Sequence, residues 1–447
     1  MNTFSDFLAR HPGIETFEVL LPDVNAQMRG KWMTRESIAK LFDGQFKLPT
    51  STVAFDIWGR DIEATVFDNG DADGVCLPLP HTLVPVPWLD RPTAQIMVAM
   101  GDVQGGEYGG DSRTVLAQIL RRYAALGLRP VVATELEFYL FRDERNADGS
   151  PRHTQLAGGQ RSVVGGQTYG IRAMDDAADF MHGVREACMV QNLPADTLIA
   201  EAAPSQFEIN LFHQEDALLA CDQCLMLKRA IKGVARRHDT LASFMAKPFG
   251  NLAGNGMHIH FSLIDDSGRN VFDNGTDTGS ELMHHAVAGC LASMAESMAL
   301  FAPNVNSWRR FRSGSHAPHA PCWGYENRST AVRIPGGSRK AIRLEHRVPG
   351  ADANPYLVVA AMLAGALCGI ESKLPAPPPT SGDAYSQHPA ALPRFWPDAL
   401  RAFEQSAFIR EYFGEEFRGV FLSSKWQELE EFTRHVSTLE YDSYLDV

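Results

Sequence analysis

The first hundred residues carry short apolar runs that are separated by Gly, Asp and Pro clusters. Such runs predict strands, because apolar stretches bounded by turn-forming residues are typical of a β-sheet. A short helix is expected before the first strand, and the acidic stretch 61–73 is expected to be a loop. The predicted strands are 17–21, 51–55 and 94–100.

From residue 111 onward, the pattern changes to helices that alternate with strands. Asp111 or Ser112 can cap the first of these helices, over 112–126. The uncharged run 355–370 is too short for an easy bilayer span and predicts a buried helix. Further helices are expected over 174–191, 216–238, 281–301 and most of 398–445, and strands over 131–141, 205–212 and 256–263.

This change of pattern predicts a domain boundary near Gly105 and Gly106. We expect a small N-terminal domain over 1–105 and a larger domain over 106–447. A chain of 447 residues is long enough for both.

Composition narrows the class of protein. Asp and Glu number 54 against 41 Lys and Arg, a net charge of −13, which argues against non-specific nucleic-acid binding. The N-terminal residues lack a basic segment followed by an apolar core, and the seven cysteines are an odd number. We therefore expect a cytoplasmic enzyme with no membrane or nucleic-acid partner.

Two carboxylates stand side by side in the predicted strand 131–141. Residues two apart in a strand point to the same face, so Glu135 and Glu137 repel each other unless a cation lies between them. A Glu-x-Glu pair is most often a solvated face. Here apolar flanks on both sides indicate a strand that is buried on both faces, which favours a functional pair.

His258 and His260 form a similar pair after the glycine-rich turn 250–256. Alone, they could be a zinc half-site or two satisfied core histidines, but no neighbouring cysteine pair or His-Glu-x-x-His sequence supports zinc. The turn would let backbone amides approach an anionic substrate closely.

Six acidic or histidine side chains look like the ligand set of a paired metal site. Carboxylates with a single imidazole suit Mg²⁺ or Mn²⁺ better than zinc. Arginines recur between residues 309 and 347, and guanidinium groups match carboxylates and phosphates. A site with two hard cations beside arginines is suited to phosphoryl transfer, so the sequence predicts an ATP-dependent enzyme. The six are Glu135, Glu137, Glu201, Glu208, His258 and Glu345.

Together these segments resemble the glutamine synthetase family, and the resemblance covers nearly the whole chain. It rests on PFGNLAGNGMHIH at 248–260, NVNSWRR at 304–310 and GADANPY at 350–356. The resemblance implies an α+β fold, in which a small N-terminal β-grasp domain precedes a catalytic domain with a curved antiparallel sheet and helices. It also implies a homo-oligomer, either a hexameric ring or a stacked dodecamer, with active sites between subunits.

The resemblance further implies a reaction in which ATP phosphorylates the γ-carboxylate of glutamate and nitrogen then attacks the acyl phosphate. Two or three Mg²⁺ or Mn²⁺ ions would assist, and Arg328 would stabilise charge on the transferring phosphoryl group. One metal would be bound by Glu137, Glu201 and Glu208, and another by Glu135, His258 and Glu345. Glutamate would contact Gly254, Arg310 and Arg347, and ATP would contact His260, Ser262, Arg328 and Arg333.

Departures from the ammonia-using members bear on the nucleophile. Where those members carry FDGSS, whose aspartate helps bind ammonium, this chain has FDIWG at 55–59, so Asp56 is kept and Trp58 is new. Those members also carry a glutamate, six residues after the arginine that matches Arg310, which closes over the intermediate and helps deprotonate ammonium. This chain has His316 at that position. Loss of that carboxylate weakens the hold on a small cation, while a neutral imidazole can still act as a base near pH 7.

Two further positions bear on substrate binding. Tyr169 is the candidate match for a tyrosine at the ammonium site. Ala253 replaces an asparagine that contacts glutamate in ammonia-using members.

We therefore expect a ligase that makes a γ-glutamylamide from glutamate and a primary amine larger than ammonia. Its catalytic residues would be Arg328, His316 and Asp56, and its amine pocket Asp56, Trp58, Tyr169 and His316. Apolar or aromatic monoamines are favoured over polyamines, because a distal ammonium would need an extra acid. The alternatives are an ammonia-using glutamine synthetase and a catalytically silent structural or nitrogen-sensing relative, which the intact ligand set disfavours.

Overall fold

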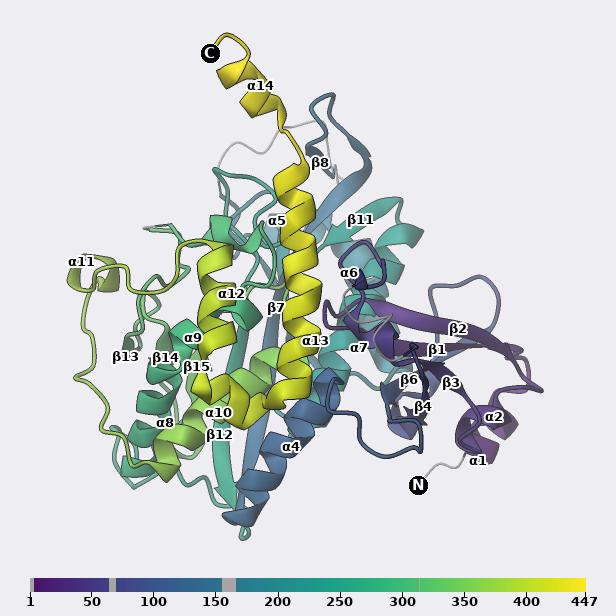
Figure 1. Ribbon diagram of the computed structural model, residues 1–447, viewed down its shortest axis with the longest axis horizontal. Coiled ribbons are helices and arrows are strands. Elements are labelled where there is room, and N and C mark those ends of the chain that lie inside the picture. Colours follow the sequence, from purple (N-terminus) through teal and green to yellow (C-terminus); the bar gives the residue numbers. More distant parts are fainter. Residues whose placement is uncertain (1–3, 64–69, 155–165, 313) are drawn as a thin grey trace.

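The computed structural model describes residues 4–63, 70–154, 166–312 and 314–447, and it contains two sheets (Figure 1). The smaller sheet belongs to the first hundred residues. At its centre, β1 (Thr16–Pro22) and β6 (Thr93–Met100) run parallel, and nearly every residue of both strands is buried. Around them lie α1 (Phe4–Arg10), β2 (Met28–Thr34), α2 (Ala39–Phe42), β3 (Lys47–Pro49), β4 (Asp73–Pro78), η2 (Pro80–Thr82) and β5 (Val84–Pro85).

Two of the three strands predicted for this part, 17–21 and 94–100, are confirmed. The third, 51–55, is wrong, because the segment forms the 3-10 helix η1 (Thr50–Ala54). Its backbone turns inward instead of joining a sheet edge, and the carbonyl of Val53 accepts a hydrogen bond from the amide of Val24 at 2.8 Å. Within the predicted loop 61–73, residues 64–69 lie outside the described residues and Asp73 begins β4.

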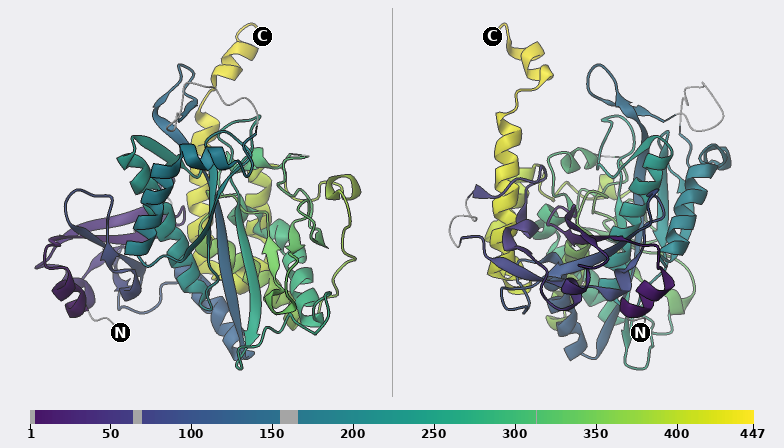
Figure 2. Two further views of the ribbon diagram at one scale, coloured as in Figure 1. Left: turned by 180° about the vertical axis from the view of Figure 1, so that it is seen from behind. Right: turned by 90° about the vertical axis from the view of Figure 1, so that its right-hand side faces the viewer.

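The larger sheet has the strand order β13-β14-β15-β12-β7-β10-β9, with β8 and β11 also paired to β7. Its strands are antiparallel except for the parallel pair β13 and β14, and β7 and β12 run side by side through its centre (Figure 2). This arrangement confirms the predicted α+β fold. The strands are β7 (Leu128–Arg145), β8 (Pro151–His153), β9 (Ala195–Ala200), β10 (Gln206–Leu211), β11 (Thr240–Ser243), β12 (Met257–Asp265), β13 (Trp323–Tyr325), β14 (Val332–Ile334) and β15 (Leu344–His346).

Helices cover one face of this sheet. α4 (Ser112–Ala125) and α7 (Ala217–Arg237) pack against β7, and α10 (Pro355–Glu371) packs against both helices and against α8 (Glu281–Ala292). The predicted cap of α4 is confirmed, since the Asp111 carboxylate accepts a hydrogen bond from the Thr114 amide at 2.8 Å. Because side chains alternate along β7, Leu136 and Phe138 enter this core and the acids beside them face away.

Two predicted helices are each divided. The segment 174–191 forms α5 (Ile171–Asp176) and α6 (Ala178–Val190), which meet at the buried Ala177. The segment 281–301 forms α8 and α9 (Met294–Phe301). At their junction, the Ser293 hydroxyl donates to the Gly289 carbonyl at 2.9 Å and competes with the regular helical hydrogen bond. The remaining short elements are η3 (Ser307–Arg310), η4 (Arg339–Ala341) and α11 (Ala384–Gln387).

The predicted helical character of 398–445 is confirmed. α12 (Trp396–Gln405) is followed by α13 (Ala407–Arg434), which is kinked at Gly414 and whose longer, C-terminal part crosses the molecule in Figure 1. The last helix, α14 (Thr438–Tyr444), projects beyond it. α13 contacts α4 of the larger part and η1 of the smaller part. The domain boundary expected near Gly105 falls between β6 and α4 and stays a prediction. Among the described helices, none combines the length and apolar composition needed to cross a membrane.

Candidate functional site

The predicted metal ligands come together because the strand register aligns them. Glu208 on β10 lies opposite Glu137 on β7, and His258 on β12 lies opposite Glu135. Glu345 on β15 lies opposite His260. Opposite residues of paired strands share a face, so these side chains all project from the face of the sheet that the helices leave free.

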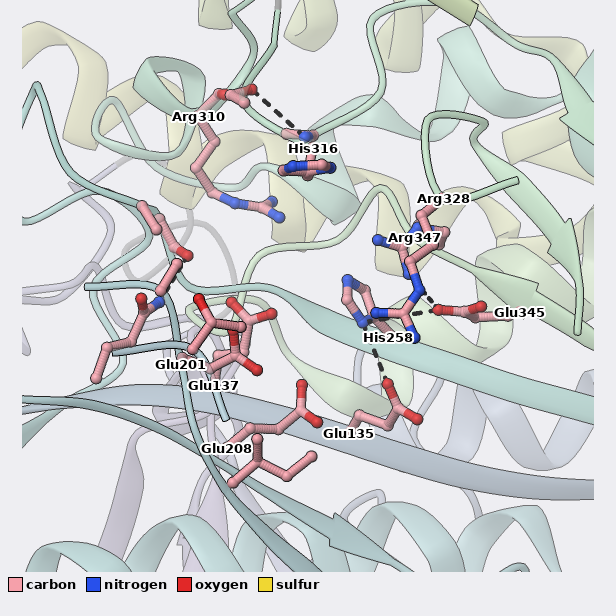
Figure 3. A pocket seen from close by; sticks show the side chains of 18 of the residues that line it. Glu135, Glu137, Glu201, Glu208, His258, Arg310, His316, Arg328, Glu345 and Arg347 are labelled. Atoms are coloured by element: carbon pink, nitrogen blue, oxygen red, sulfur yellow. Dashed lines mark hydrogen bonds and ion pairs between the residues drawn. The ribbon is translucent and has the colours of Figure 1, made fainter. Parts of the chain in front are cut away.

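The four carboxylates and His258 line a cavity of about 350 Å³ that most of the predicted site residues share (Figure 3). Arg310 and Arg328 lie across the cavity from Glu137, Glu201 and Glu208, whereas Arg347 lies beside Glu345 (Figure 3). Of the predicted site residues, those that line it are Glu135, Glu137, Tyr169, Glu201, Glu208, Gly254, His258, Arg310, His316, Arg328, Arg333, Glu345 and Arg347. The buried His260 lies immediately behind Glu135, and Ser262 follows it on the same face of β12.

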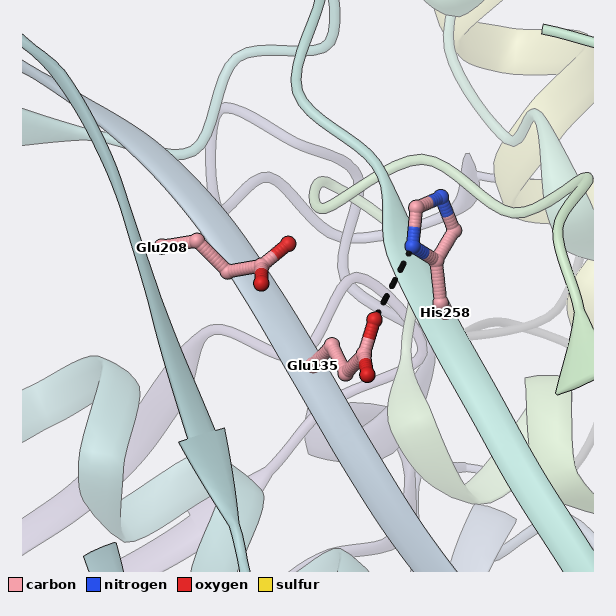
Figure 4. A group of neighbouring side chains, drawn as sticks. All are labelled: Glu135, Glu208 and His258. Carbon is pink, nitrogen blue, oxygen red and sulfur yellow. Dashed lines mark hydrogen bonds and ion pairs between the residues drawn. The ribbon is translucent and has the colours of Figure 1, made fainter. Parts of the chain in front are cut away.

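Glu135, Glu208 and His258 converge on one point (Figure 4), with ligand atoms that all lie within 4.8 Å of one another. Burial, followed by the charges of Glu137, Glu135 and Glu201, raises the pKa of Glu208 to about 9. Burial and the charge of Glu137 raise the pKa of Glu201 to about 7. Carboxylates crowded in this way are matched by a divalent cation, so the donor set fits Mg²⁺ or Mn²⁺.

Glu135 also belongs to a second group of ligand-type side chains, with His260 and Glu345. The Nδ1 atom of His260 accepts a hydrogen bond from Nε of Arg343 at 3.1 Å, and its Nε2 lies 2.8 Å from Glu135. Because arginine can only donate, Nε2 must carry the proton and donate to Glu135. His260 therefore orients a metal ligand and does not itself offer a lone pair to a cation.

Hydrogen bonds decide the charge of Glu135. Burial alone would raise its pKa, but the hydrogen bonds to His258 and His260 outweigh burial and hold it well below its usual range. Glu135 is therefore ionised beside the cation position, in contrast to the neighbouring Glu208.

Glu345 is held by two arginines. Its carboxylate accepts a hydrogen bond from Nη1 of Arg333 at 2.7 Å and a second from Arg347. Burial opposes ionisation, but the positive charge of Arg347 lowers the pKa of Glu345 to about 2. The strands β14 and β15 thus bring an ionised carboxylate and two guanidinium groups to one wall of the cavity, an arrangement that can bind a phosphate through the arginines and a cation through the acid.

The turn before β12 brings backbone groups close to the cavity. A side chain at Gly254 would approach the carbonyl oxygen of Ala246 to 2.6 Å, so only glycine fits there. The amide of Gly256 donates to Glu137 at 2.6 Å. The side chain of Gln206 holds the turn in place, because its Nε2 donates to the Gly254 carbonyl at 2.9 Å.

Two cavity residues were missed in the sequence because their roles depend on tertiary contacts. Gln206 is almost fully buried beneath the glycine turn. Asn210 lies opposite Glu135 in the register of β10 and β7, and its Oδ1 is buried without a hydrogen-bond donor among the described residues. Because side chains alternate along a strand, Asn210 lies on the same face as Glu208. This spacing is the local feature of the sequence that could have identified Asn210 as a cavity residue.

The cavity is also lined by His316, which Figure 3 shows across from the carboxylates of Glu137 and Glu201, and by Tyr169. Both have positive φ angles, 59° and 57°, which are uncommon for residues with a side chain and recur at functional sites. Nη1 of Arg328 lies 3.3 Å from the Tyr169 hydroxyl. The Ser315 hydroxyl donates to the Arg310 carbonyl at 2.7 Å and so ties the segment that carries His316 to the buried Arg310.

Asp56 and Trp58 do not line this cavity. They lie in the N-terminal part, where the fully buried carboxylate of Asp56 accepts hydrogen bonds from the amides of Trp58 at 3.0 Å and Arg60 at 2.9 Å. The Trp58 ring is 47% exposed. A single chain therefore does not bring these two residues together with Tyr169 and His316.

Comparisons with known proteins agree with this geometry. The glutamine synthetase catalytic domain family matches residues 109–444. The chain is 38% identical over 438 residues to gamma-glutamylputrescine synthetase PuuA of Escherichia coli (strain K12), which covers 98% of this chain and 93% of that protein. It is 31% identical over 455 residues to a glutamate–isopropylamine ligase of Pseudomonas sp, covering 99% and 97% of the two chains.

A solved structure of a GmaS/ADP complex superposes with a TM-score of 0.87 and 27% identity, and it covers 100% of both chains. The catalytic-domain match spans most of the chain, and the identity with PuuA extends along nearly all of it. The chain is a ligase that belongs to the glutamine synthetase family.

Proposed function

We propose that this enzyme joins glutamate to a primary amine larger than ammonia, with ATP as the energy source. In the first step an oxygen of the glutamate γ-carboxylate bonds to the γ-phosphorus of ATP, and the bond to the β-phosphate oxygen breaks to release ADP. In the second step the amine nitrogen attacks the γ-carbonyl carbon and phosphate leaves. The amine gives up a proton, so the products are a γ-glutamylamide, ADP and phosphate.

The side chains along the cavity support the first step. Arg310, Arg347 and the turn at Gly254 are suited to hold the carboxylates of glutamate, because buried guanidinium and amide groups match carboxylate oxygens. Arg328 and Arg333 would contact the phosphates of ATP, together with His260 and Ser262 at the nucleotide side. Magnesium or manganese ions held by the six ligands would neutralise the phosphates during transfer.

One observation carries the choice of nucleophile: the imidazole of His316, and not a carboxylate, stands at the wall of the cavity that Tyr169 also lines. A carboxylate there would attract and help deprotonate ammonium, whereas an imidazole offers a base without a negative charge. The names of the two relatives, a gamma-glutamylputrescine synthetase and a glutamate–isopropylamine ligase, support an amine as the nucleophile.

The described lining also bears on the class of amine. Apart from the ligand set, the described residues of the cavity include no carboxylate, and Thr168, Ala202, Ala253 and Ala317 also line it. Within one chain, a distal ammonium group would meet no acid outside the ligand set, so an apolar or aromatic monoamine fits this part of the pocket better than a polyamine. The similarity to a putrescine synthetase keeps a diamine as the second candidate.

We further propose a cytoplasmic homo-oligomer, built as a hexameric ring or a stacked dodecamer, with an N-terminal domain over 1–105 and a catalytic domain over 106–447. In such a ring, Asp56 and Trp58 of one subunit would complete the amine pocket of its neighbour. Their position outside the cavity of their own chain supports an active site that two subunits share.

An amine panel tests the proposal. ADP release is measured with glutamate, ATP and Mg²⁺ in the presence of ammonia, isopropylamine, benzylamine or putrescine. We expect an amine to saturate the enzyme at a lower concentration than ammonia. Saturation by ammonia at low millimolar concentration with no response to amines would contradict it, and no ADP release with any of them would favour a catalytically silent relative.

A further inference from the structure

One face of α13 contacts a short loop of the N-terminal part, residues 55–61, which we call the entrance loop. The contacting residues of α13 are Ser424, Gln427, Glu428, Glu431 and Phe432. Their spacing places them on one stripe along the helix, since residues three and four apart are neighbours on a helix surface. About 370 residues of sequence separate the stripe from the entrance loop.

The two residues at the centre of the stripe fix the backbone and the acid of the entrance loop. Nε2 of Gln427 donates to the Asp56 carboxylate at 3.0 Å and to the Asp61 carbonyl at 3.0 Å. The neighbouring Glu428 accepts a hydrogen bond from the Ile57 amide at 2.8 Å. The loop is therefore held to the helix at both of its ends and at its middle.

Glu428 belongs to a charged group that is fully buried. It forms an ion pair with Lys425 at 3.0 Å, both side chains have no exposed surface, and Asn25 donates to Glu428 at 3.1 Å. Burying two charges carries a desolvation cost that well-packed apolar residues would avoid. The arrangement is suited to holding the entrance loop in one conformation more than to adding stability.

The end of the stripe orients the Trp58 ring. Trp58 and Phe432 pack with ring centroids 5.3 Å apart, although both side chains are more than 40% exposed. On the Trp58 ring lies the guanidinium group of Arg60, 4.6 Å from the centroid, and Arg60 is itself paired with Glu431 at 3.3 Å. An exposed indole with two partners keeps a defined orientation and leaves ring surface free.

We infer that this stripe of α13 positions Trp58 for the amine, so that amine selectivity depends on Gln427 and Phe432 as positioning residues. The fully buried Asp56 carboxylate, which also pairs with Arg60 at 2.7 Å, anchors the loop that carries Trp58. The inference rests on the proposed function, because it requires the entrance loop to contact the amine. Neither positioning residue lines the cavity of its own chain. Within the chain, Gln427 contacts the entrance loop and the Glu63 amide, and Phe432 contacts the Trp58 ring.

The test compares Phe432→Ala with Trp58→Ala in the full-length enzyme. KM and kcat are measured by ADP release with isopropylamine, benzylamine and putrescine, and KM is also measured for glutamate and ATP. We expect Phe432→Ala to raise KM for the preferred amine by about fivefold, the loss expected for one aromatic pair, and to leave KM for glutamate and ATP unchanged. Phe432→Tyr keeps the ring contact and should retain the wild-type values.

Thr433→Ala is the matched control, because Thr433 is exposed beside Phe432 and its hydroxyl bonds to carbonyls of its own helix. Gln427→Ala should likewise raise KM for the preferred amine and leave KM for glutamate and ATP unchanged. If Trp58→Ala changes KM for the amine and neither α13 variant does, the inference is overturned and the proposed function stands. If Trp58→Ala leaves KM for every amine unchanged, the inference is overturned, and so is the role that the proposed function gives to the entrance loop.

Discussion

The Nε2 atom of His260 lies 2.8 Å from Oε1 of Glu135, and the side chain behind it, Arg343, leaves that nitrogen as the protonated one. His260 thus fixes the orientation of a carboxylate that the two groups of ligand-type side chains share. Residues that orient a ligand from behind commonly contribute one to two orders of magnitude to metal affinity.

The first prediction concerns this orienting contact. We expect His260→Ala to weaken Mn²⁺ binding by about 10-fold to 100-fold, because Glu135 loses the donor that holds its carboxylate in place. Free Mn²⁺ is followed by electron paramagnetic resonance in the absence of ATP, so the measurement does not depend on activity. His258→Ala removes a side chain from the converging ligand group and should weaken Mn²⁺ binding more than His260→Ala does. Equal Mn²⁺ affinity in wild type and His260→Ala would refute the orienting role.

The second prediction is a pH dependence of stability. The pKa of Glu208, raised by burial and neighbouring carboxylates to about 9, lies far above the usual value of about 4.3. Between these values the folded protein binds more protons than the unfolded chain, so stability falls as pH rises. We expect the Tm of EDTA-treated enzyme to fall from about pH 5 to about pH 8, and Mg²⁺ to raise Tm more at the higher pH, where it binds ionised carboxylates.

Glu208→Gln is the control for this profile, since it removes the proton-binding group and keeps the shape. Its Tm should vary less with pH over the same window, and Mg²⁺ should raise it less. Glu345 does not disturb the comparison, because its pKa is lowered to about 2 and its stabilising effect is lost only in more acidic solution. The buried His346, whose pKa is lowered to about 3, contributes a rise in stability up to about pH 6.5 in both proteins, so the test is the difference between them. A Tm difference between wild type and Glu208→Gln that stays constant from pH 5 to pH 8 without metal would contradict the raised pKa.

Local patterns in the sequence were sufficient to predict which ligand-type residues lie side by side on the same strand. The period of two placed Glu135 with Glu137 and His258 with His260, and it needed no knowledge of the fold. The pairing of β7 with β10, β12 and β15 is not written in any local pattern, because register follows from turns and from packing across the whole sheet. The resemblance to a family supplied that information in the form of a ligand set.

Contacts between distant segments could not be predicted in this way. The 3-10 helix at 50–54 was predicted as a strand, because 51–55 is a short apolar run between turn-forming residues. Its conformation depends on the Val24 amide, in a different segment. In the same way, no feature near Gln427 indicates that it holds Asp56, or that Arg343 determines which nitrogen of His260 carries the proton.

The third prediction addresses the choice between ammonia and amine. We expect His316→Glu to raise kcat/KM for ammonia by about tenfold, which corresponds to about 1.4 kcal/mol, because a carboxylate at this wall attracts ammonium and helps deprotonate it. The same variant should raise KM for the preferred amine. His316→Gln, which adds no charge, should not improve the use of ammonia. An enzyme that already uses ammonia well would gain little from His316→Glu, and that result would favour the ordinary glutamine synthetase.

The last prediction concerns Arg328, which approaches the cavity from the loop before β14 and whose Nη1 lies 3.3 Å from the Tyr169 hydroxyl. If Arg328 stabilises charge on the transferring phosphoryl group, Arg328→Ala should lower kcat by about 10³-fold and change KM for glutamate little, because the contact forms mainly in the transition state. ADP release at saturating amine measures this. Arg328→Lys should restore only part of the rate, since a lysine cannot reproduce the planar fork. Tyr169→Phe removes the hydroxyl contact and keeps the guanidinium group, so a loss as large as that of Arg328→Ala would show that the tyrosine, and not the charge, is what the reaction needs.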